Sequence, residues 1–208
     1  MRHLLILALA AVACAANATV IYDNGAPDEL NGNEMTNWRQ SEDVTNNGVN
    51  TFNTIVFWTS ALSSNIHDVD LQISFDDGAG NPGFVAVDVQ GAVSSVATGL
   101  FDNGLAEYKN TFTFGDVTCT GSFVYHVAML GNYEELAQQR DDVYWVTTGL
   151  NGTGTGRESF NDLQNNWFDN GQEHAFRLEE DAVTPEPCSM AALGLGAVAL
   201  IRRRKASK

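Results

Sequence analysis

Short runs in which apolar and polar residues alternate are the feature that most constrains this 208-residue chain. Residues 68–75 alternate strictly, which is the two-residue period of a strand with one buried face, so we expect Asp68 and Asp70 to point outward. Residues 51–59 are apolar on both faces and rich in β-branched and aromatic side chains, which predicts a central strand. Further strands are predicted over residues 84–89, 109–114, 123–130, 143–148 and 174–179.

Turn signals separate these segments, because glycine, asparagine and proline favour the backbone angles that tight turns require. Many short strands with frequent turns predict an all-β fold, an antiparallel β-sandwich of jelly-roll type, with a closed barrel as the alternative. Residues 132–140 have a helical pattern, and a short surface turn of helix is expected there. The turn signals occur at residues 76–78, 81–83, 102–104, 151–152 and 169–171.

An aromatic residue followed by Asp-Asn-Gly occurs three times, beginning at Tyr22, Phe101 and Phe168. One interpretation is a repeated ligand-binding loop. The favoured interpretation is a set of tight hairpin turns, because Asn-Gly forms them readily. The spacings of 79 and 67 residues are too uneven for a repeat array.

The central segment, residues 19–182, is expected to form one domain and is strongly acidic. Residues 19–181 hold 25 Asp and Glu against five Lys and Arg. Such a surface repels phosphates, which excludes nucleic acid and anionic lipid as partners. Cys119 is the one cysteine of this segment, so stability must come from packing rather than from disulfides, and its thiol is expected to be buried.

The N-terminus has the parts of a secretory signal peptide over residues 1–18. Arg2 gives a positive start, residues 4–13 are apolar, and residues 16–18 supply the small side chains that signal peptidase requires. We expect cleavage after residue 18. A lipoprotein signal ending before Cys14 is the alternative.

The C-terminal segment, residues 183–208, joins three features in a fixed order. An acid between prolines is followed by the apolar residues 188–201 and then by a cluster of basic residues. The apolar run has 14 residues, whereas a membrane-spanning helix needs about 20, and long arginine side chains can extend the run by reaching the interface. A short transmembrane helix with its basic end in the cytoplasm is therefore expected. The motif residues are Pro185, Glu186, Pro187, Arg202, Arg203 and Arg204.

This order of motif, apolar helix and arginine cluster resembles the PEP-CTERM sorting signal of bacterial exported proteins. The resemblance implies export across the inner membrane and processing near Pro185-Glu186-Pro187 by a membrane-embedded exosortase. It also implies that the chain is held in the membrane by this helix before processing. The product would reside in the cell envelope, at the outer surface or in the extracellular matrix. Residues 21–25, 31–37 and 175–178 resemble the first and last strands of β-sandwich modules fused to such tails, most of which lack an assigned activity.

Catalytic motifs give little guidance, since the sequence contains no G-x-S-x-G, H-E-x-x-H or P-loop pattern. His67, His126 and His174 are far apart, and His126 is expected to be a buried, hydrogen-bonded residue rather than a catalytic base. Carboxylates are frequent enough for chance pairs, and a glycosidase needs two that face one cleft. No residue is therefore assigned a catalytic role.

One loop is a candidate metal site. Asp76, Asp77 and Asn81 place oxygen donors among glycines, as sites for hard cations do, which predicts calcium as the ligand. A simple hairpin loop explains these residues equally well. Apart from calcium, no cofactor is expected.

Four tryptophans fall into two pairs. Trp38 and Trp167 stand in asparagine-rich stretches, where an exposed indole beside amides can stack on a sugar ring. A cap on an open end of the sandwich is the alternative for this pair. Trp58 and Trp145 lie in strand patterns and are expected in the core.

Together these features favour an exported, non-catalytic protein of the cell envelope or extracellular matrix, whose β-sandwich binds glycan or protein. The alternative is a secreted hydrolase that acts on polysaccharide with a pair of carboxylates. A structural adhesion subunit without a small ligand is a third interpretation.

Overall fold

The computed structural model describes residues 18–62, 64–136, 140–149, 156–160 and 166–180. None of these residues is helical, and the strands pair antiparallel, which confirms the predicted all-β class. The strands are β1 (Thr19–Asp23), β2 (Gly32–Glu34), β3 (Trp38–Ala61), β4 (Asp68–Asp76), β5 (Pro82–Ala92), β6 (Ser94–Asp102), β7 (Leu105–Gly131), β8 (Val143–Val146), β9 (Arg157–Phe160), β10 (Phe168–Asp169) and β11 (Phe176–Glu180).

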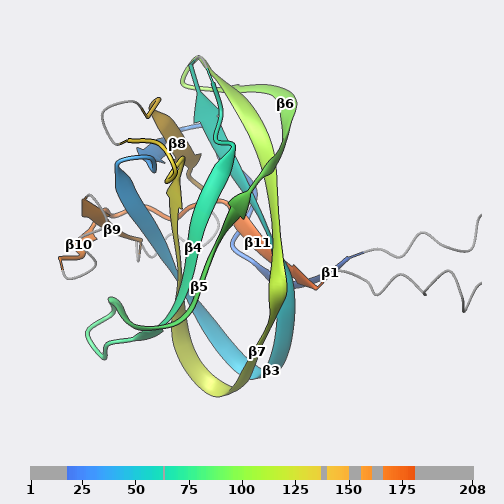
Figure 1. Cartoon of the computed structure of the whole chain (residues 1–208), viewed down its shortest axis with the longest axis vertical. Coiled ribbons are helices and arrows are strands. Elements are labelled where there is room, and N and C mark those ends of the chain that lie inside the picture. Colours follow the sequence, from blue (N-terminus) through green and yellow to red (C-terminus); the bar gives the residue numbers. More distant parts are fainter. Residues whose placement is uncertain (1–17, 63, 137–139, 150–155, 161–165, 181–208) are drawn as a thin grey trace, which may run out of the picture. The chain divides into compact units, whose positions relative to one another are not determined.

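Two long strands, β3 and β7, form the centre of the fold and pass through both of its halves (Figure 1). They pair from Gln40 with Met129 to Ala61 with Ala106, with one irregularity near Phe52. In the first half, β9 and β10 lie beside the start of β3, and β4 and β5 lie beside the end of β7. In the second half, β11 and β8 pair with the end of β3, and β6 pairs with the start of β7. The result is a β-sandwich-like arrangement.

The hydrophobic core lies between the two halves. The ring of Phe57 meets that of Trp145, with their centroids 6.2 Å apart. Trp145 is fully buried and Trp58 nearly so, which confirms that both belong to the core. Burying one such apolar side chain stabilises the fold by roughly 1.5–3 kcal/mol. The main cluster includes Ile55, Phe57, Val69, Leu71, Ile73, Val127, Met129, Phe176 and Leu178.

Most predicted strands are present. Residues 51–59 lie in β3, which has neighbours on both sides and is central as predicted. The segments 84–89, 109–114 and 123–130 fall inside β5 and β7, and the last two predicted strands correspond to β8 and β11. The Asn103-Gly104 pair joins β6 to β7 with φ values of 48° and 81°, as a two-residue hairpin turn requires.

The predicted helix over residues 132–140 is wrong for its described part, residues 132–136, which forms turns. Asn132 has a left-handed backbone with φ of 50°, which cannot begin a right-handed helix. The Arg140 guanidinium donates to the carbonyl oxygens of Tyr133 and Glu135, at 3.1 Å each, and so fixes this turn.

The expectation that Asp68 and Asp70 point outward is also wrong, because β4 is buried on both faces. Asp70 forms an ion pair with the fully buried Arg39, with Nη2 and Oδ2 3.0 Å apart, and its Oδ2 also accepts a hydrogen bond from Gln90. Asp68 is paired with His67 at 2.9 Å. The alternation located the strand correctly, but its polar side chains line a second buried face, where the ion pair of Asp70 with Arg39 offsets the cost of burial.

Candidate functional site

An open groove of about 470 Å³ is formed where the β4–β5 loop meets the segment around β10. It brings together two candidates that are separate in the sequence, the asparagine-flanked Trp167 and two residues of the acidic loop. The residues that line it are Asp77, Asn81, Pro82, Gly83, Asn166, Trp167 and Phe168.

The acidic loop is closed by hydrogen bonds to its own carboxylates. Asp77 Oδ1 accepts the backbone N–H groups of Ala79 and Asn81, at 2.7 and 3.1 Å, and its Oδ2 accepts the Asn81 amide at 3.1 Å. These donors, the Ala79 N–H first, lower the pKa of Asp77, so the carboxylate is ionised at neutral pH. Gly78 and Gly80 have positive φ values of 87° and 82°, which explains why glycine stands at both positions.

Residues 78–83 also match the spacing G-x-G-x-x-G. In dinucleotide-binding folds this motif joins a strand to a helix. Here it joins two antiparallel strands, β4 and β5, so the mechanism behind that motif does not apply.

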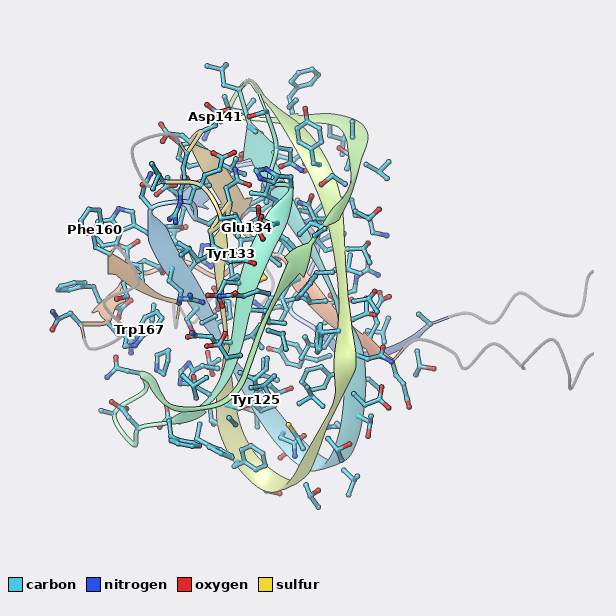
Figure 2. The ribbon with its side chains drawn as sticks, viewed as in Figure 1. Tyr125, Tyr133, Glu134, Asp141, Phe160 and Trp167 are labelled. Carbon is cyan, nitrogen blue, oxygen red and sulfur yellow. The ribbon has the colours of Figure 1, made fainter. Side chains whose placement is uncertain are left out.

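Arg157 connects the loop to β10. Its Nε donates to the Gly80 carbonyl at 2.9 Å, and its Nη1 pairs with Asp169 at 2.9 Å. Since Asp169 follows Trp167 by two residues, this contact places the indole against the loop (Figure 2). A basic residue that the sequence analysis did not single out therefore assembles the groove.

The two candidate tryptophans have different environments. Trp167 is half-buried in the groove, and its indole Nε1 is buried with no acceptor among the described residues. Trp38 is also half-buried, but it packs against Phe160, with ring centroids 4.8 Å apart, and is not among the lining residues of the groove. The structure thus joins Trp167 to Asp77 and Asn81 but does not bring Trp38 to them.

Asp76 faces away from the groove, toward His126. Its Oδ2 lies 2.9 Å from His126 Nε2, and this contact is the main reason that the pKa of Asp76 is lowered. His126 is buried as expected, with one ring nitrogen bonded, while its Nδ1 has no partner among the described residues. Of the three predicted calcium ligands, Asp76 is therefore engaged by a histidine.

A second polar group lies inside the fold, and the sequence analysis missed it. Carboxylate oxygens of Glu42, Asp43 and Glu173 lie within 4.8 Å of one another. Glu42 is fully buried and Glu173 is 5% exposed. Because Glu42 and Asp43 belong to β3 and Glu173 precedes β11, this buried acid cluster connects the two halves of the sandwich.

His174 and Asn24 hold the buried acid cluster. Glu42 Oε1 accepts the backbone N–H of His174 at 2.9 Å and also contacts Nδ1 of the same residue. The Asn24 amide donates to Glu173 Oε2 at 3.1 Å and to the His174 carbonyl at 2.9 Å. The His174 ring stacks on Trp145, with centroids 4.8 Å apart, so the imidazole is fixed.

Burial decides the electrostatics of this cluster. It raises the pKa of Glu42 well above the ordinary value, and the neighbouring Glu173 raises it further. Burial also lowers the pKa of His174 to about 3, so the imidazole is neutral at pH 7 and brings no positive charge to the acids. Glu42 Oε2 receives no hydrogen bond from any described residue.

One sequence signal pointed toward this cluster. Two of the three Asp-Asn-Gly triplets supply asparagines beside it: Asn24 binds Glu173, and Asn170 lies with Glu42 against Gly156. Neither asparagine is the centre of a β-hairpin, which corrects the hairpin interpretation for these two triplets. The acids themselves carried no signal, since they are 131 positions apart in the sequence.

An apolar pocket of about 340 Å³ lies elsewhere, beside Tyr125 (Figure 2). Ile73, Phe75, Val117 and Phe123 line it, together with Cys119. Cys119 is 8% exposed and free, and burial raises the pKa of its thiol, which confirms the predicted buried thiol.

The sorting motif, with Pro185, Glu186, Pro187 and the arginines that follow, lies outside the described residues, as do residues 1–17. The described residues contain no helix that is long and apolar enough to cross a membrane. No protein-family model, curated protein or solved structure matches the chain.

Proposed function

We propose that this protein is an exported, non-catalytic β-sandwich of jelly-roll type that binds glycan in the cell envelope or extracellular matrix. The observation that carries the proposal is the open groove in which Trp167 lies beside Asp77 and Asn81. Glycan recognition requires a flat apolar surface for the C–H face of a sugar ring and polar groups for its hydroxyls. The groove offers both kinds of group within one concave surface.

The polar groups of the groove suit hydroxyl recognition. The ionised Asp77 carboxylate is an acceptor, and the Asn81 amide, which it orients, offers both a donor and an acceptor. The half-buried Trp167 ring supplies the apolar surface beside these polar groups. Loop hydrogen bonds and the Arg157 contact hold these groups in place, so little conformational entropy is lost on binding.

A polysaccharide hydrolase is the competing function. It would need a second carboxylate about 5–10 Å from the first, and one of the two must keep its proton at neutral pH. Asp77 is the one carboxylate among the described residues that line the groove, and its lowered pKa disfavours a role as proton donor. Glu42, whose pKa is raised by burial, is enclosed in the fold, where a polysaccharide does not reach. These points support binding without catalysis.

The location follows from the resemblance of residues 183–208 to the PEP-CTERM signal. An exosortase-type enzyme would be the processing partner, and the C-terminal helix would hold the chain in the membrane until then. Intact-mass analysis of exported material should show loss of Arg202, Arg203 and Arg204. Recovery of chains that end at Lys208 in the extracellular fraction would contradict this part of the proposal.

Glycan retention tests the groove directly. Full-length protein and two variants, Trp167→Ala and Trp38→Ala, are run through gels that contain neutral or acidic polysaccharides. Loss of one aromatic stacking contact should weaken retention roughly 2- to 12-fold for Trp167→Ala. Trp38→Ala is the matched control, because Trp38 packs on Phe160 and does not line the groove. Equal retention of wild type and Trp167→Ala would overturn the proposal.

A further inference from the structure

The buried acid cluster brings three carboxylates together, and one of them, Glu42, has an oxygen that its hydrogen bonds do not satisfy. Three carboxylates with oxygens within 4.8 Å of one another repel, most strongly between the buried Glu42 and Glu173, while Asp43 is half-buried. His174 donates its backbone N–H to Glu42 Oε1 and contacts the same oxygen through Nδ1, and neither group satisfies Oε2. Arg39 pairs with Asp70, Arg157 with Asp169, Arg140 with backbone carbonyls, and Arg177 lies over the Trp58 ring.

A second observation points to a missing positive partner. Glu42 has no exposed surface, yet its Oε2 has no hydrogen-bond donor among the described residues. Leaving a buried carboxylate oxygen without a partner costs roughly 1–3 kcal/mol or more. The buried polar groups of folded proteins are almost always paired, with protein, water or an ion. Glu42 Oε2 therefore needs a cation, a proton shared with Glu173, or a bound water molecule.

Further oxygen atoms converge next to the Glu42 carboxylate. A Cβ at Gly156 would lie 2.6 Å from Asn170 Oδ1 and 3.0 Å from Glu42 Oε1, and closer still to the Gln172 carbonyl oxygen. Glycine is thus required at this position, because any side chain would fill the space that these oxygens surround. Carboxylate, amide and carbonyl oxygens together form the ligand set that calcium prefers, at about 2.3–2.6 Å from the ion.

We propose that Glu42, Asp43 and Glu173 bind a calcium ion, with Asn170 Oδ1 and the Gln172 carbonyl oxygen as further ligands. Two ligands bound to one ion at calcium distances lie no more than about 5 Å apart, and the three carboxylates meet this condition. Six to eight oxygens surround calcium, so water completes the shell. The ion joins β3 to the segment before β11, and it therefore locks the two halves of the sandwich together.

This site is independent of the proposed glycan groove and differs from the 76–81 loop. In that loop, Asp77 already receives three hydrogen bonds and Asp76 is paired with His126, so neither carboxylate lacks a partner. Both loop carboxylates thus have partners without a cation, whereas Glu42 Oε2 has none among the described residues.

The test uses the full-length chain in a mild detergent, stripped with EDTA and melted in CaCl₂, MgCl₂ or NaCl at matched ionic strength. Extracellular calcium modules have a Kd of about 10⁻⁴–10⁻³ M, so 10 mM CaCl₂ is near-saturating. At a hundredfold excess over Kd, we expect calcium to raise Tm by about 5–10 °C beyond NaCl. Magnesium should do much less, because it demands a smaller octahedral shell.

Two variants show whether the calcium-induced rise in Tm comes from the buried acid cluster or from the 76–81 loop. Glu42→Gln should remove the calcium shift while folding in EDTA at least as stably as wild type, because it relieves the repulsion. The double variant Asp76→Asn/Asp77→Asn should keep the full shift. Loss of the shift in this loop variant, with retention in Glu42→Gln, would move the site to the loop and overturn the proposal.

A shared proton or a bound water molecule is the other way to satisfy Glu42. In that case wild type melts at the same temperature in CaCl₂ and NaCl, and equilibrium dialysis with ⁴⁵Ca finds no ion bound at concentrations up to 10 mM, which would overturn the proposal. Dialysis of the wild type does not depend on any variant. One bound calcium per chain, lost in Glu42→Gln or, if that variant does not fold, in Glu173→Gln, supports the site.

Discussion

The 76–81 loop and the buried acid cluster have similar residues but opposite electrostatic situations. In the loop, the Asp77 carboxylate is exposed and accepts three hydrogen bonds, so its pKa is lowered. In the cluster, Glu42 is enclosed beside Glu173 with one oxygen unpartnered, so its pKa is raised. The number of nearby oxygens is therefore a poor guide to a cation site. An unmet need for positive charge is the better one.

The 76–81 loop and the buried acid cluster also differ in how the fold assembles them. Residues 76–81 are contiguous, and backbone N–H groups of the same turn stabilise their charge. The cluster combines β3 with the segment before β11 and with Gly156, so it forms only when the sandwich closes. We therefore expect changes in the cluster to affect global stability and changes in the loop to act locally.

The largest effect is expected at Gly156, where close packing around the cluster can be broken directly. In Gly156→Ala the new methyl group would overlap Asn170 Oδ1 and the Gln172 carbonyl, and overpacking of this kind costs about 1–3 kcal/mol or more. Urea unfolding measures the loss. Gly115→Ala is the matched control, because no atom lies within 4 Å of the added Cβ and its free energy of unfolding should change little. Equal effects at both glycines would mean that the cluster is loosely packed.

The second prediction concerns the pH dependence of the free energy of unfolding, measured in EDTA so that no calcium is bound. A raised pKa means that the folded state binds a proton at Glu42 more tightly than the unfolded state does. Protonated Glu42 therefore contributes to the stability of the fold at low pH. This contribution is lost as the pH rises from about 4.5, the ordinary pKa, through the raised pKa of the folded state. The free energy of unfolding of wild type relative to Glu42→Gln should fall between pH 5 and pH 8, by at most about 1.4 kcal/mol per pH unit. The opposite slope would show that Glu42 is stabilised as a carboxylate without calcium.

The fold class could be predicted because strand periodicity and turn residues are local signals. Residues 51–59 were identified as central, and Asn103-Gly104 as a hairpin turn, from the sequence alone. The length of β3 and β7 could not be seen, since polar residues such as Asn46 and Asn50 interrupt their apolar pattern. The orientation of Asp70 was mispredicted because its partner, Arg39, lies 31 residues earlier on another strand.

The candidate sites, too, could be predicted only where the signal lies in neighbouring residues of the sequence. Asp77, Asn81 and Trp167 were recognised by composition, but their common groove depends on Arg157, which joins the β4–β5 loop to β10. The buried acid cluster could not be predicted, because burial decides its chemistry and the sequence of an acidic protein does not reveal which acids are buried. The Asp-Asn-Gly triplets were visible, yet hairpin formation was the simpler explanation for them.

The third prediction tests the loop where it meets the core. The hydrogen bond from His126 is the first cause of the lowered pKa of Asp76, so this contact stabilises the fold above the unfolded pKa and is lost as pH falls through the folded pKa. Asp76→Asn should cost about 1 kcal/mol at pH 7, since a partly exposed charged hydrogen bond becomes a neutral one. The cost should disappear once the pH lies below the lowered folded pKa, where wild-type Asp76 is protonated. A cost that persists there would indicate lost packing rather than charge.

The smallest effect on stability is expected for Asp77→Asn, which sharpens the comparison most. The new amide keeps one acceptor for the backbone N–H groups of Ala79 and Asn81, and the side chain is exposed, so Tm should barely change. The calcium response should also persist, because the loop is not the proposed ion site. Glycan retention should fall, since Asp77 lines the groove and its carboxylate orients the Asn81 amide. A variant that instead kept retention but lost the calcium response would reverse the roles of the two regions, making the exposed loop the cation site and leaving the buried acids to share a proton.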